Sequence, residues 1–523
     1  MIYDKALIIS RYHEDSSNPI YNSYIKGIQS QCNFTHFIDY FDQINALGKN
    51  GFEKQTIKTL EKENINLVFF IFVSGDVTID PYFIETIAKD RFIAMVFWDM
   101  EQFFEQIDRY YAQLADLVIL SANYEYSKIL KTYNIESICP FSLFDKDKYK
   151  PSEHINRTID VSFVGEVTKG KRKEYIEYLI DNNIQIESYG VGTKNGKVSF
   201  NKVVDIFNKS KINLSFTGTY ANNLYSFTSN INNHILQNKG KPIEIALCNG
   251  FILTEYVESL NKVFETNSID MFKDKKTLLK KINYYLEHRE EREAMAKKAY
   301  QYAIKNYDSE KGFEKIFKMI DIMQIKDKKI ILDKKFLQIH NTFHIYYLIV
   351  FLSNYRFKSA IEELKYIRFT KGFHTKDIVN FSKYLIKFRY KRFLFNRHCN
   401  KIFKNLKNKD IVIYGAGIHT LNLFKNFEIF KTLNIMAIAD QNKTLWGTKI
   451  NKIPIISPKE IHNYANTVII SSFKFENDIK QYLIQEYNNK LELHTLYNSK
   501  YNEDLISDKI DIYQIYKKSI HFI

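Results

Sequence analysis

Short, uninterrupted apolar runs alternate with helix-type patterns over the first 150 residues of the chain. Such runs are typical of buried strands, and the stretches 52–63 and 103–114 between them have the apolar spacing of amphipathic helices. The predicted strands are Ala6–Ser10, Phe34–Asp39, Leu67–Phe72, Phe92–Trp98 and Leu117–Leu120. Continuous apolar strands separated by helices favour a parallel sheet that is covered on both faces. We therefore expect a doubly wound, Rossmann-like α/β domain over residues 1–152.

The same alternation resumes after a break at residues 139–151, where proline and polar residues indicate a domain boundary. Strands are predicted at Asp160–Val164, Ile184–Ser188, Ile212–Phe216 and Phe251–Thr254. The stretch 217–240, rich in Asn, Ser and Thr, predicts a mobile loop over a functional site. The pattern therefore indicates a second Rossmann-like domain over residues 153–325, which ends in the charged helical stretch 274–306.

Beyond residue 325 the pattern changes twice. Residues 326–408 carry apolar and aromatic side chains at helical spacing, which predicts an all-helical connector of three or four helices. A strand, glycine, helix and strand pattern then predicts a third, smaller Rossmann-like domain over residues 409–500, followed by a tail, 501–523. The predicted fold class is α/β, with two Rossmann-like domains, a helical connector and the third small domain.

The net charge of +15 has two interpretations, an anionic partner or a lysine-rich coding bias. No dense Lys/Arg block is present, and nucleic acid is not expected as a partner. The four cysteines lie far apart, which supports neither a CxxC zinc site nor a disulfide framework, so we expect a reducing compartment.

The sequence also bears on location. No apolar run approaches the roughly 20 residues that a membrane-spanning helix needs, and the N-terminus lacks the features of a signal peptide. We therefore expect a cytoplasmic protein. The basic aromatic run 387–404 is interpreted as a packed amphipathic helix, with peripheral contact to the inner face of the membrane as the alternative.

In the first domain, polar residues follow the predicted strands, where ligands bind in sheets of this kind. His13 and Asp99 are the candidate catalytic residues, as a base or as a partner of an acceptor hydroxyl, and Glu101 could act in the same way. Caps and turns favour the same residue types, so helix capping is the alternative interpretation of each.

The second domain carries the candidate donor site, centred on the stretch KGKPIEIALCNG. Lys239 and Lys241 lie in a loop before a short helix that is predicted to start at Pro242 and to end at Gly250, and Glu244 lies in its first turn. Basic side chains and free amides there could hold a diphosphate, while the carboxylate accepts from sugar hydroxyls. The other candidates are Gly165 and Arg172 after the first strand of the domain, and Gly190 and Gly192 in YGVG. The alternative is that Glu244 pairs with a neighbouring lysine in an ordinary Rossmann core.

Several motifs resemble, in order, the second half of GT-B glycosyltransferases of the group 1, spore-maturation type. They are DVSFVGE, the downstream Arg172, SYGVG, FNKSKINLSF, KPIEIALCNGFILTEY and the helical run KKINYYLEHREEREAMAKKAY. The resemblance implies a metal-independent glycosyltransferase, with a nucleotide diphosphosugar donor and Glu244 at the donor ribose. It also implies two facing Rossmann-like domains, with closing helices that can cross back to the first domain. The implied acceptor is a cell-surface polysaccharide, a glycolipid or a protein.

The match departs from the family pattern at two positions. Lys241 stands where an arginine is usual, and a lysine neutralises phosphate without the bidentate fork of a guanidinium. The first glutamate of the family's pair is absent, because the stretch before Lys239 is ILQN. A non-catalytic sugar-nucleotide-binding or scaffolding protein is therefore the alternative function.

The third domain offers a separate nucleotide-binding candidate. Gly415 and Gly417 lie between a predicted strand and helix, and Asp440 stands about 20 residues further on, the acidic position of dinucleotide sites. NAD or a nucleotide sugar is the expected ligand type. No Tyr-x-x-x-Lys pair follows, so the pattern favours binding or docking over hydride transfer.

Overall fold

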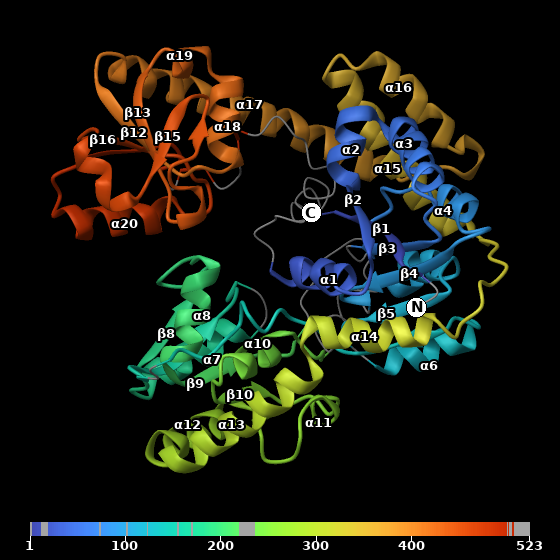
Figure 1. The fold of residues 1–523 in the computed structure, drawn as a ribbon, viewed down its shortest axis with the longest axis horizontal. Helices are drawn as coiled ribbons and strands as arrows, with labels where there is room; N and C mark the ends of the chain where they lie inside the picture. Colours follow the sequence, from blue (N-terminus) through green and yellow to red (C-terminus); the bar gives the residue numbers. More distant parts are fainter. Residues whose placement is uncertain are drawn as a thin grey trace. The chain divides into compact units, whose positions relative to one another are not determined.

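The computed structural model describes most of the chain. The described residues are 3–11, 19–72, 75–100, 103–122, 124–153, 156–168, 171–218, 236–498, 500–501 and 505–506. They divide into two compact units, one ending at Ile378 and one beginning at Val379. The first unit holds two sheets and the second holds one (Figure 1).

The first sheet has the strand order β2-β1-β3-β4-β5-β6, and all its described pairings are parallel. Its strands are β1 Lys5–Ser10, β2 Phe34–Asp39, β3 Leu67–Phe72, β4 Phe92–Phe97, β5 Leu117–Leu120 and β6 Ser137–Ile138. Every side chain of β3, β4 and β5 is buried. Helices cover both faces of the sheet, and strands buried on both faces are apolar along their whole length. The predicted strands therefore match β1 to β5 within one residue.

The helices of the first sheet follow the predicted alternation. They are α1 Pro19–Gln29, α2 Tyr40–Leu47, α3 Lys49–Lys62, α4 Pro81–Ile87, α5 Arg109–Ala112 and α6 Glu125–Thr132. The predicted helix at 103–114 begins instead as a π-helix, Phe104–Asp108, in which Asp108 N donates to Phe103 O. The Asp108 carboxylate accepts from Gly75 N at 2.9 Å, a contact from another loop that the local pattern does not contain.

The second sheet has the order β11-β10-β9-β7-β8 and is also parallel. Its strands are β7 Ile159–Val164, β8 Ile186–Tyr189, β9 Ser210–Ser215, β10 Ile252–Glu255 and β11 Asp270–Phe272. Its helices are α7 Arg172–Asp181, α8 Phe200–Lys209, α10 Lys241–Leu247, α11 Leu260–Val263, α12 Lys275–Glu287 and α13 Arg289–Asn306. Two parallel α/β sheets in one unit are consistent with a pair of Rossmann-like domains.

Helix α14, Ser309–Ile320, returns from the second sheet to the first (Figure 1). Its residues Phe313, Ile316, Phe317 and Ile320 are buried in one core with α1 and the strands of the first sheet. A Cβ on Gly27 of α1 would lie 2.3 Å from the Phe313 ring, so glycine permits this close helix packing. The resemblance implied such a crossing for the helices of the stretch 274–306, and the helix that packs on the first sheet lies just beyond that stretch.

The chain then runs along the first sheet before it becomes helical again. Residues 326–333, included in the predicted helical connector, form no helix. Lys328 and Asp116 form a buried ion pair at 2.8 Å, and Asp116 also accepts from the Lys326 backbone N–H. These contacts hold the segment extended against the first sheet, a tertiary effect that helical spacing cannot reveal.

Three helices follow in the connector region: α15 Lys334–Ser353, α16 Phe357–Glu363 and α17 Thr375–Leu406. Helix α15 packs on α3 and α4 through buried polar side chains, among them Lys49 and His344. Helix α17 leads from the first unit into the second. Among the residues that the structure describes, no helix combines the length and apolarity required to cross a membrane.

The second unit contains a six-stranded sheet of order β14-β15-β13-β12-β16-β17. Its strands are β12 Asp410–Tyr414, β13 Asn434–Ala439, β14 Lys449–Ile450, β15 Ile453–Ile456, β16 Thr467–Ile470 and β17 Glu492–Thr495. Its helices are α18 Ile418–Asn426, α19 Glu428–Lys431 and α20 Glu476–Tyr487. Only the β14–β15 pairing is antiparallel among those described.

Candidate functional site

The loops that follow β7 and β8 meet at the carboxyl edge of the second sheet. Gly165 N donates to Tyr189 O at 2.8 Å, and Gly190 follows directly with φ +128°. A Cβ at Gly190 would lie 2.1 Å from Gly165 O, so no other residue fits there without displacing the backbone. Gly192, at φ +79°, approaches the Thr168 side chain in the same way. The structure thus brings together the three glycines predicted from separate motifs.

Arg172 begins α7 beside these loops. Its guanidinium donates from Nη1 to Glu166 O at 3.1 Å and from Nη2 to Gly218 O at 3.3 Å. It therefore ties the loop after β7 to the loop after β9, next to the glycines. A cation at the meeting point of three strand ends is suited to bind an anion.

Lys241 and Glu244 lie in the first turn of α10 and form an ion pair. Lys241 Nζ is 2.8 Å from Glu244 Oε2, and the ammonium lies 5.4 Å from the centre of the Phe207 ring. Burial, with the nearby Glu244 charge, raises the pKa of Tyr149. The pair is the arrangement expected for the alternative role of Glu244. The ion pair still leaves the Glu244 carboxylate able to accept further hydrogen bonds, because its two oxygens offer about four acceptor positions.

Asp99 joins the site from the first sheet. It follows β4 in the left-handed conformation, at φ +49°, and its carboxylate accepts from Gln237 Nε2 at 2.5 Å. Lys239 Nζ lies 3.4 Å from the same oxygen. Two predicted residues 140 positions apart in sequence are therefore neighbours. The other predicted catalytic residue, His13, lies outside the described residues, as does Glu101.

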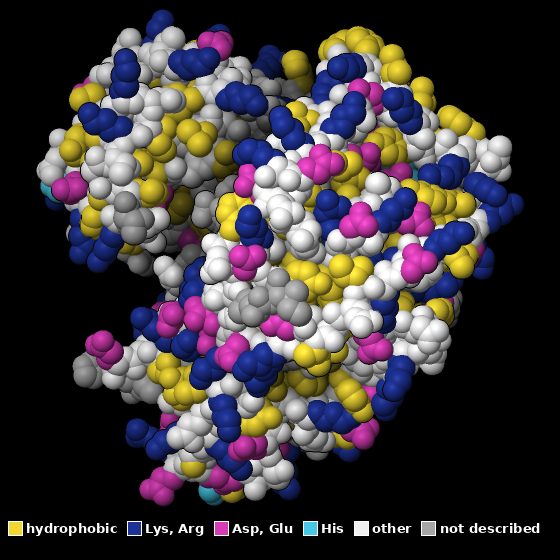
Figure 2. Space-filling model, turned by 45° about the vertical axis from the view of Figure 1, so that its right-hand side comes forward, with side chains coloured by type: hydrophobic (Ala, Val, Ile, Leu, Met, Phe, Trp, Pro, Cys, Tyr) yellow, Lys and Arg dark blue, Asp and Glu magenta, His cyan; other side chains and the backbone are white. Residues whose placement is uncertain are grey.

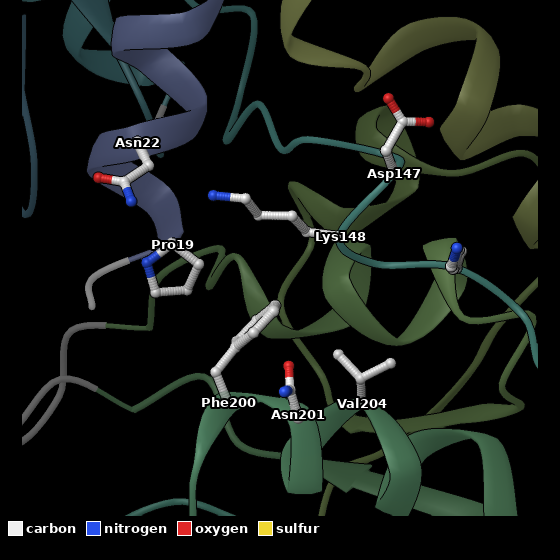
Figure 3. Close-up of a pocket in the computed structure, with 8 residues that line it drawn as sticks. Pro19, Asn22, Asp147, Lys148, Phe200, Asn201 and Val204 are labelled. Carbon is white, nitrogen blue, oxygen red and sulfur yellow. The ribbon is translucent and has the colours of Figure 1, made fainter. Parts of the chain in front are cut away.

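A cavity of about 550 Å³ opens between α1, the segment 147–150 and α8. In Figure 3, Lys148 extends toward Asn22 of α1, while Phe200 and Val204 rise from α8. The cavity therefore combines an aromatic face with a cation and amides, which suits a polar ligand with a flat or ring-shaped part. None of these residues was predicted as a site residue, although Asp147, Lys148 and Lys150 lie in the segment 139–151, where the sequence indicates a domain boundary.

Beside the third sheet, Asp440 forms a hydrogen bond with the glycine loop that follows β12. Gly415, at φ +115°, donates through its N–H to Ala439 O at 2.8 Å, and Ala416 N donates to Asp440 Oδ2 at 2.7 Å. Asp440 Oδ1 accepts from Asn442 N at 2.8 Å. Both oxygens of the Asp440 carboxylate thus accept hydrogen bonds from backbone N–H groups. In a dinucleotide site, the carboxylate would accept from the ribose hydroxyls instead. Gly417 has open space around its Cα.

Comparison with known proteins finds similarity in two parts of the chain. Residues 168–318 match the protein family described as glycosyl transferase-like. The matched stretch contains the second sheet from α7 onward, with Arg172, the glycines of YGVG, both lysines and Glu244. Residues 407–491 match a second family, described as C2185-like, N-terminal.

Solved structures resemble the chain only distantly. Anabaena HepE in complex with UDP and glucose has 10% identity and a TM-score of 0.43, covering 61% of this chain and all of HepE. Sucrose-phosphate synthase from Thermosynechococcus elongatus has 8% identity and a TM-score of 0.42, over 61% of this chain and 98% of that one. The pneumococcal O-GlcNAc transferase GtfA, with UDP and GlcNAc, has 14% identity and a TM-score of 0.37, over 52% and 60%. Structural similarity with TM-scores this low carries no argument about function. The search of curated proteins found no match.

Two further polar groups lie near the second sheet, and neither was predicted from the sequence as part of a site. Glu255, at the end of β10, accepts from the backbone N–H of Thr217 at 2.9 Å and of Gly218 at 3.2 Å. The sequence could have indicated Glu255 by its position, because it is a carboxylate at the carboxyl end of a predicted strand. The Asn238 side chain is 5% exposed, and neither its oxygen nor its nitrogen has a hydrogen-bond partner within the described part of the chain. Such groups are rare in folded proteins, and this one adjoins Lys239.

Proposed function

We propose that the chain is a glycosyltransferase that moves a hexose-type sugar from a nucleotide diphosphosugar to an acceptor. The observation that carries this proposal is the family match of residues 168–318. It covers every predicted donor-binding residue except Gly165. We propose further that the reaction needs no metal, that it takes place in the cytoplasm, and that the acceptor is a cell-surface polysaccharide, a glycolipid or a protein.

The donor diphosphate would lie against the basic side chains at the carboxyl edge of the second sheet. Arg172, Lys239 and Lys241 supply positive charge there, and Gly190 and Gly192 let the phosphates approach the backbone. Glu244 would accept from the ribose hydroxyls through acceptor positions that Lys241 leaves open. Among the described residues, the buried Asn238 side chain beside Lys239 has no hydrogen-bond partner, which supports a polar ligand at this position.

Catalysis in this arrangement comes from charge on the leaving group. As the glycosidic bond to the diphosphate breaks, negative charge grows on the phosphate oxygens, and prearranged cations stabilise it more than the ground state. Asp99 reaches the same place from the first sheet, through its contact with Lys239. We propose that Asp99 holds Lys239 in position or accepts from an acceptor hydroxyl, and that His13 is the second candidate base.

We propose a separate role for each part of the chain. Residues 1–152 would provide the acceptor side and residues 153–325 the donor side, with the connector at 326–408. Residues 409–500 would serve binding or docking, because the Asp440 carboxylate is already used by the glycine loop.

A non-catalytic sugar-nucleotide-binding protein is the second candidate. The ion pair between Lys241 and Glu244 favours it, because the two charged groups of the donor motif satisfy each other. The two candidates differ in turnover and not in binding.

Turnover therefore tests the proposal. The full chain, incubated with a panel of nucleotide diphosphosugars, is expected to release nucleotide diphosphate from at least one of them. Glu244→Ala should lower this rate by about tenfold to a hundredfold, since a hydrogen bond to a charged group contributes about 1.5–3 kcal/mol. Glu428→Ala is the matched control, because it removes a glutamate from another ion pair of the same i,i+3 type. Binding without any release would favour the second candidate.

A further inference from the structure

Helix α16 has an unusual distribution of side chains, because its carboxylate is buried and its apolar side chains face solvent. Glu363 is 1% exposed, and its Oε1 lies 2.6 Å from His344 Nδ1 and 3.1 Å from Lys49 Nζ. On the opposite side of the same helix, Phe357 is 59% and Ile361 is 65% exposed. A surface helix of a globular protein normally has the reverse pattern.

The buried polar cluster fixes this orientation. Lys49 comes from α3 and His344 from α15, and His344 Nε2 lies 3.0 Å from His340 Nε2. If α16 were rotated about its axis, its apolar side chains would be buried, but Glu363 would move away from the buried Lys49. An unpaired buried charge is strongly unfavourable, so the apolar side chains stay outside.

The exposed apolar side chains extend beyond α16 on both sides. We call them, together with the lysines named below, the α16 surface: Leu352, Tyr355, Phe357, Ile361, Leu364, Phe369 and Phe373. Tyr355 is 83% exposed at the turn between α15 and α16, where its φ is +57°. A bulky residue in the left-handed region is strained, and glycine or asparagine would fit better. Single exposed apolar residues are ordinary, but a contiguous group indicates an interaction site.

The fully exposed charged side chains of the α16 surface are lysines. Lys358, Lys365, Lys371 and Lys376 are exposed, whereas Glu362 of α16 is half-buried. At the top of Figure 2, hydrophobic side chains lie among Lys and Arg side chains, with Asp and Glu side chains nearby. Aromatic and aliphatic side chains with exposed lysines between them fit a surface that is apolar beneath and negatively charged above.

We propose that the α16 surface docks the first unit onto an anionic lipid bilayer. Helix α16 would lie in the plane of the headgroups, with Phe357, Ile361 and Leu364 at the acyl boundary and Lys358 and Lys365 at the phosphates. The proposal is independent of the glycosyltransferase proposal. It also differs from the alternative drawn from residues 387–404, which lie outside this surface.

Co-sedimentation of the full chain with vesicles tests the docking. The chain is expected to bind vesicles of phosphatidylglycerol and phosphatidylcholine in equal parts, and to bind pure phosphatidylcholine much less. The double variant Phe357→Ser/Ile361→Ser should lower the partition coefficient by about tenfold or more, because two apolar side chains leave the interface. Lys358→Glu/Lys365→Glu should have a similar effect that fades at high salt.

Two matched controls keep the result specific. Ile180→Ser/Ile322→Ser removes two isoleucines elsewhere that are at least about as exposed as Phe357, and Lys276→Glu/Lys280→Glu reverses two exposed lysines on α12. Both should bind the anionic vesicles as the unchanged chain does. The proposal is overturned if the chain ignores anionic vesicles, or if the control variants lose as much binding as the α16 variants. It is also overturned if the α16 variants abolish only self-association, which would make a second copy of the chain the occupant.

Discussion

The second and third sheets present the same local pattern, a strand, a glycine loop and a helix, yet their carboxylates are used differently. Glu244 pairs with the side chain of Lys241 at an edge where Arg172 and Lys239 also lie. Asp440 instead accepts from two backbone N–H groups of its own sheet. Whether a glycine loop can serve a nucleotide thus depends on what already occupies the nearby carboxylate. The motif alone does not decide it.

The glycines of the two sheets divide along a different line from the carboxylates. Gly190 and Gly415 both have positive φ, and each would place a Cβ against the backbone oxygen of a neighbouring loop. Gly417 has φ −87° and open space around it, so nothing in the fold requires a glycine there. The comparison therefore yields predictions on stability as well as on binding.

The largest effect on stability is expected at Gly190. Gly190→Ala would place a methyl group 2.1 Å from Gly165 O at φ +128°, and should lower the free energy of unfolding of the first unit by about 2–4 kcal/mol. Gly417→Ala is the control and should change the second unit by less than about 1 kcal/mol. Urea unfolding measures both. Equal stability of the two variants would contradict the distinction between a glycine that the backbone requires and one that it does not.

Asp440→Ala tests whether the third sheet uses its carboxylate for the fold. Removal of the acceptor leaves Ala416 N and Asn442 N without their partner, which should cost the second unit about 1–3 kcal/mol. Faster amide exchange at Ala416 and Asn442 should accompany the loss. Donor affinity should stay unchanged, and a weaker donor affinity would move the nucleotide site to the third sheet.

A smaller, pH-dependent effect is expected at Glu53 of α3, a carboxylate that serves neither backbone nor ligand. Burial raises the pKa of its carboxyl to about 7, against the lowering effect of the Tyr366 hydrogen bond. The folded chain therefore binds more protons than the unfolded chain between about pH 4.5 and pH 7, and its stability falls as pH rises through that range.

Glu53→Gln removes this dependence. At pH 8 the variant should be more stable than the unchanged chain by about 1–2 kcal/mol, and near pH 4.5 the two should agree. Urea midpoints at the two pH values give the difference. A variant that is less stable at pH 8 would show that Lys49, also nearby, stabilises the ionised carboxylate.

The sequence predicted the strands better than the site. Runs such as LVFFIF at β3 are uninterrupted because both faces of the sheet are covered, so their limits could be read directly. The π-helix at Phe104–Asp108 and the extended segment 326–333 could not be predicted, because Gly75 and Asp116 stabilise them from distant positions.

The same reason separates the predicted from the unpredicted parts of the candidate site. Glu244 and the glycines stand in local motifs, and the motifs located them. The contacts of Asp99 with Gln237 and Lys239 join two sheets across about 140 residues, and no local pattern encodes them. The choice of Glu244 between Lys241 and a ribose is a competition between partners, which residue types alone do not settle.

The most direct test of a donor site on the second sheet is calorimetric titration of the full chain with a panel of nucleotide diphosphosugars, repeated with Glu244→Ala and Asp440→Ala. We predict that at least one donor binds and that Glu244→Ala weakens this binding by about tenfold or more. Asp440→Ala should leave the affinity unchanged. Binding that survives Glu244→Ala and is lost in Asp440→Ala would contradict the assignment, as would the absence of binding to every donor.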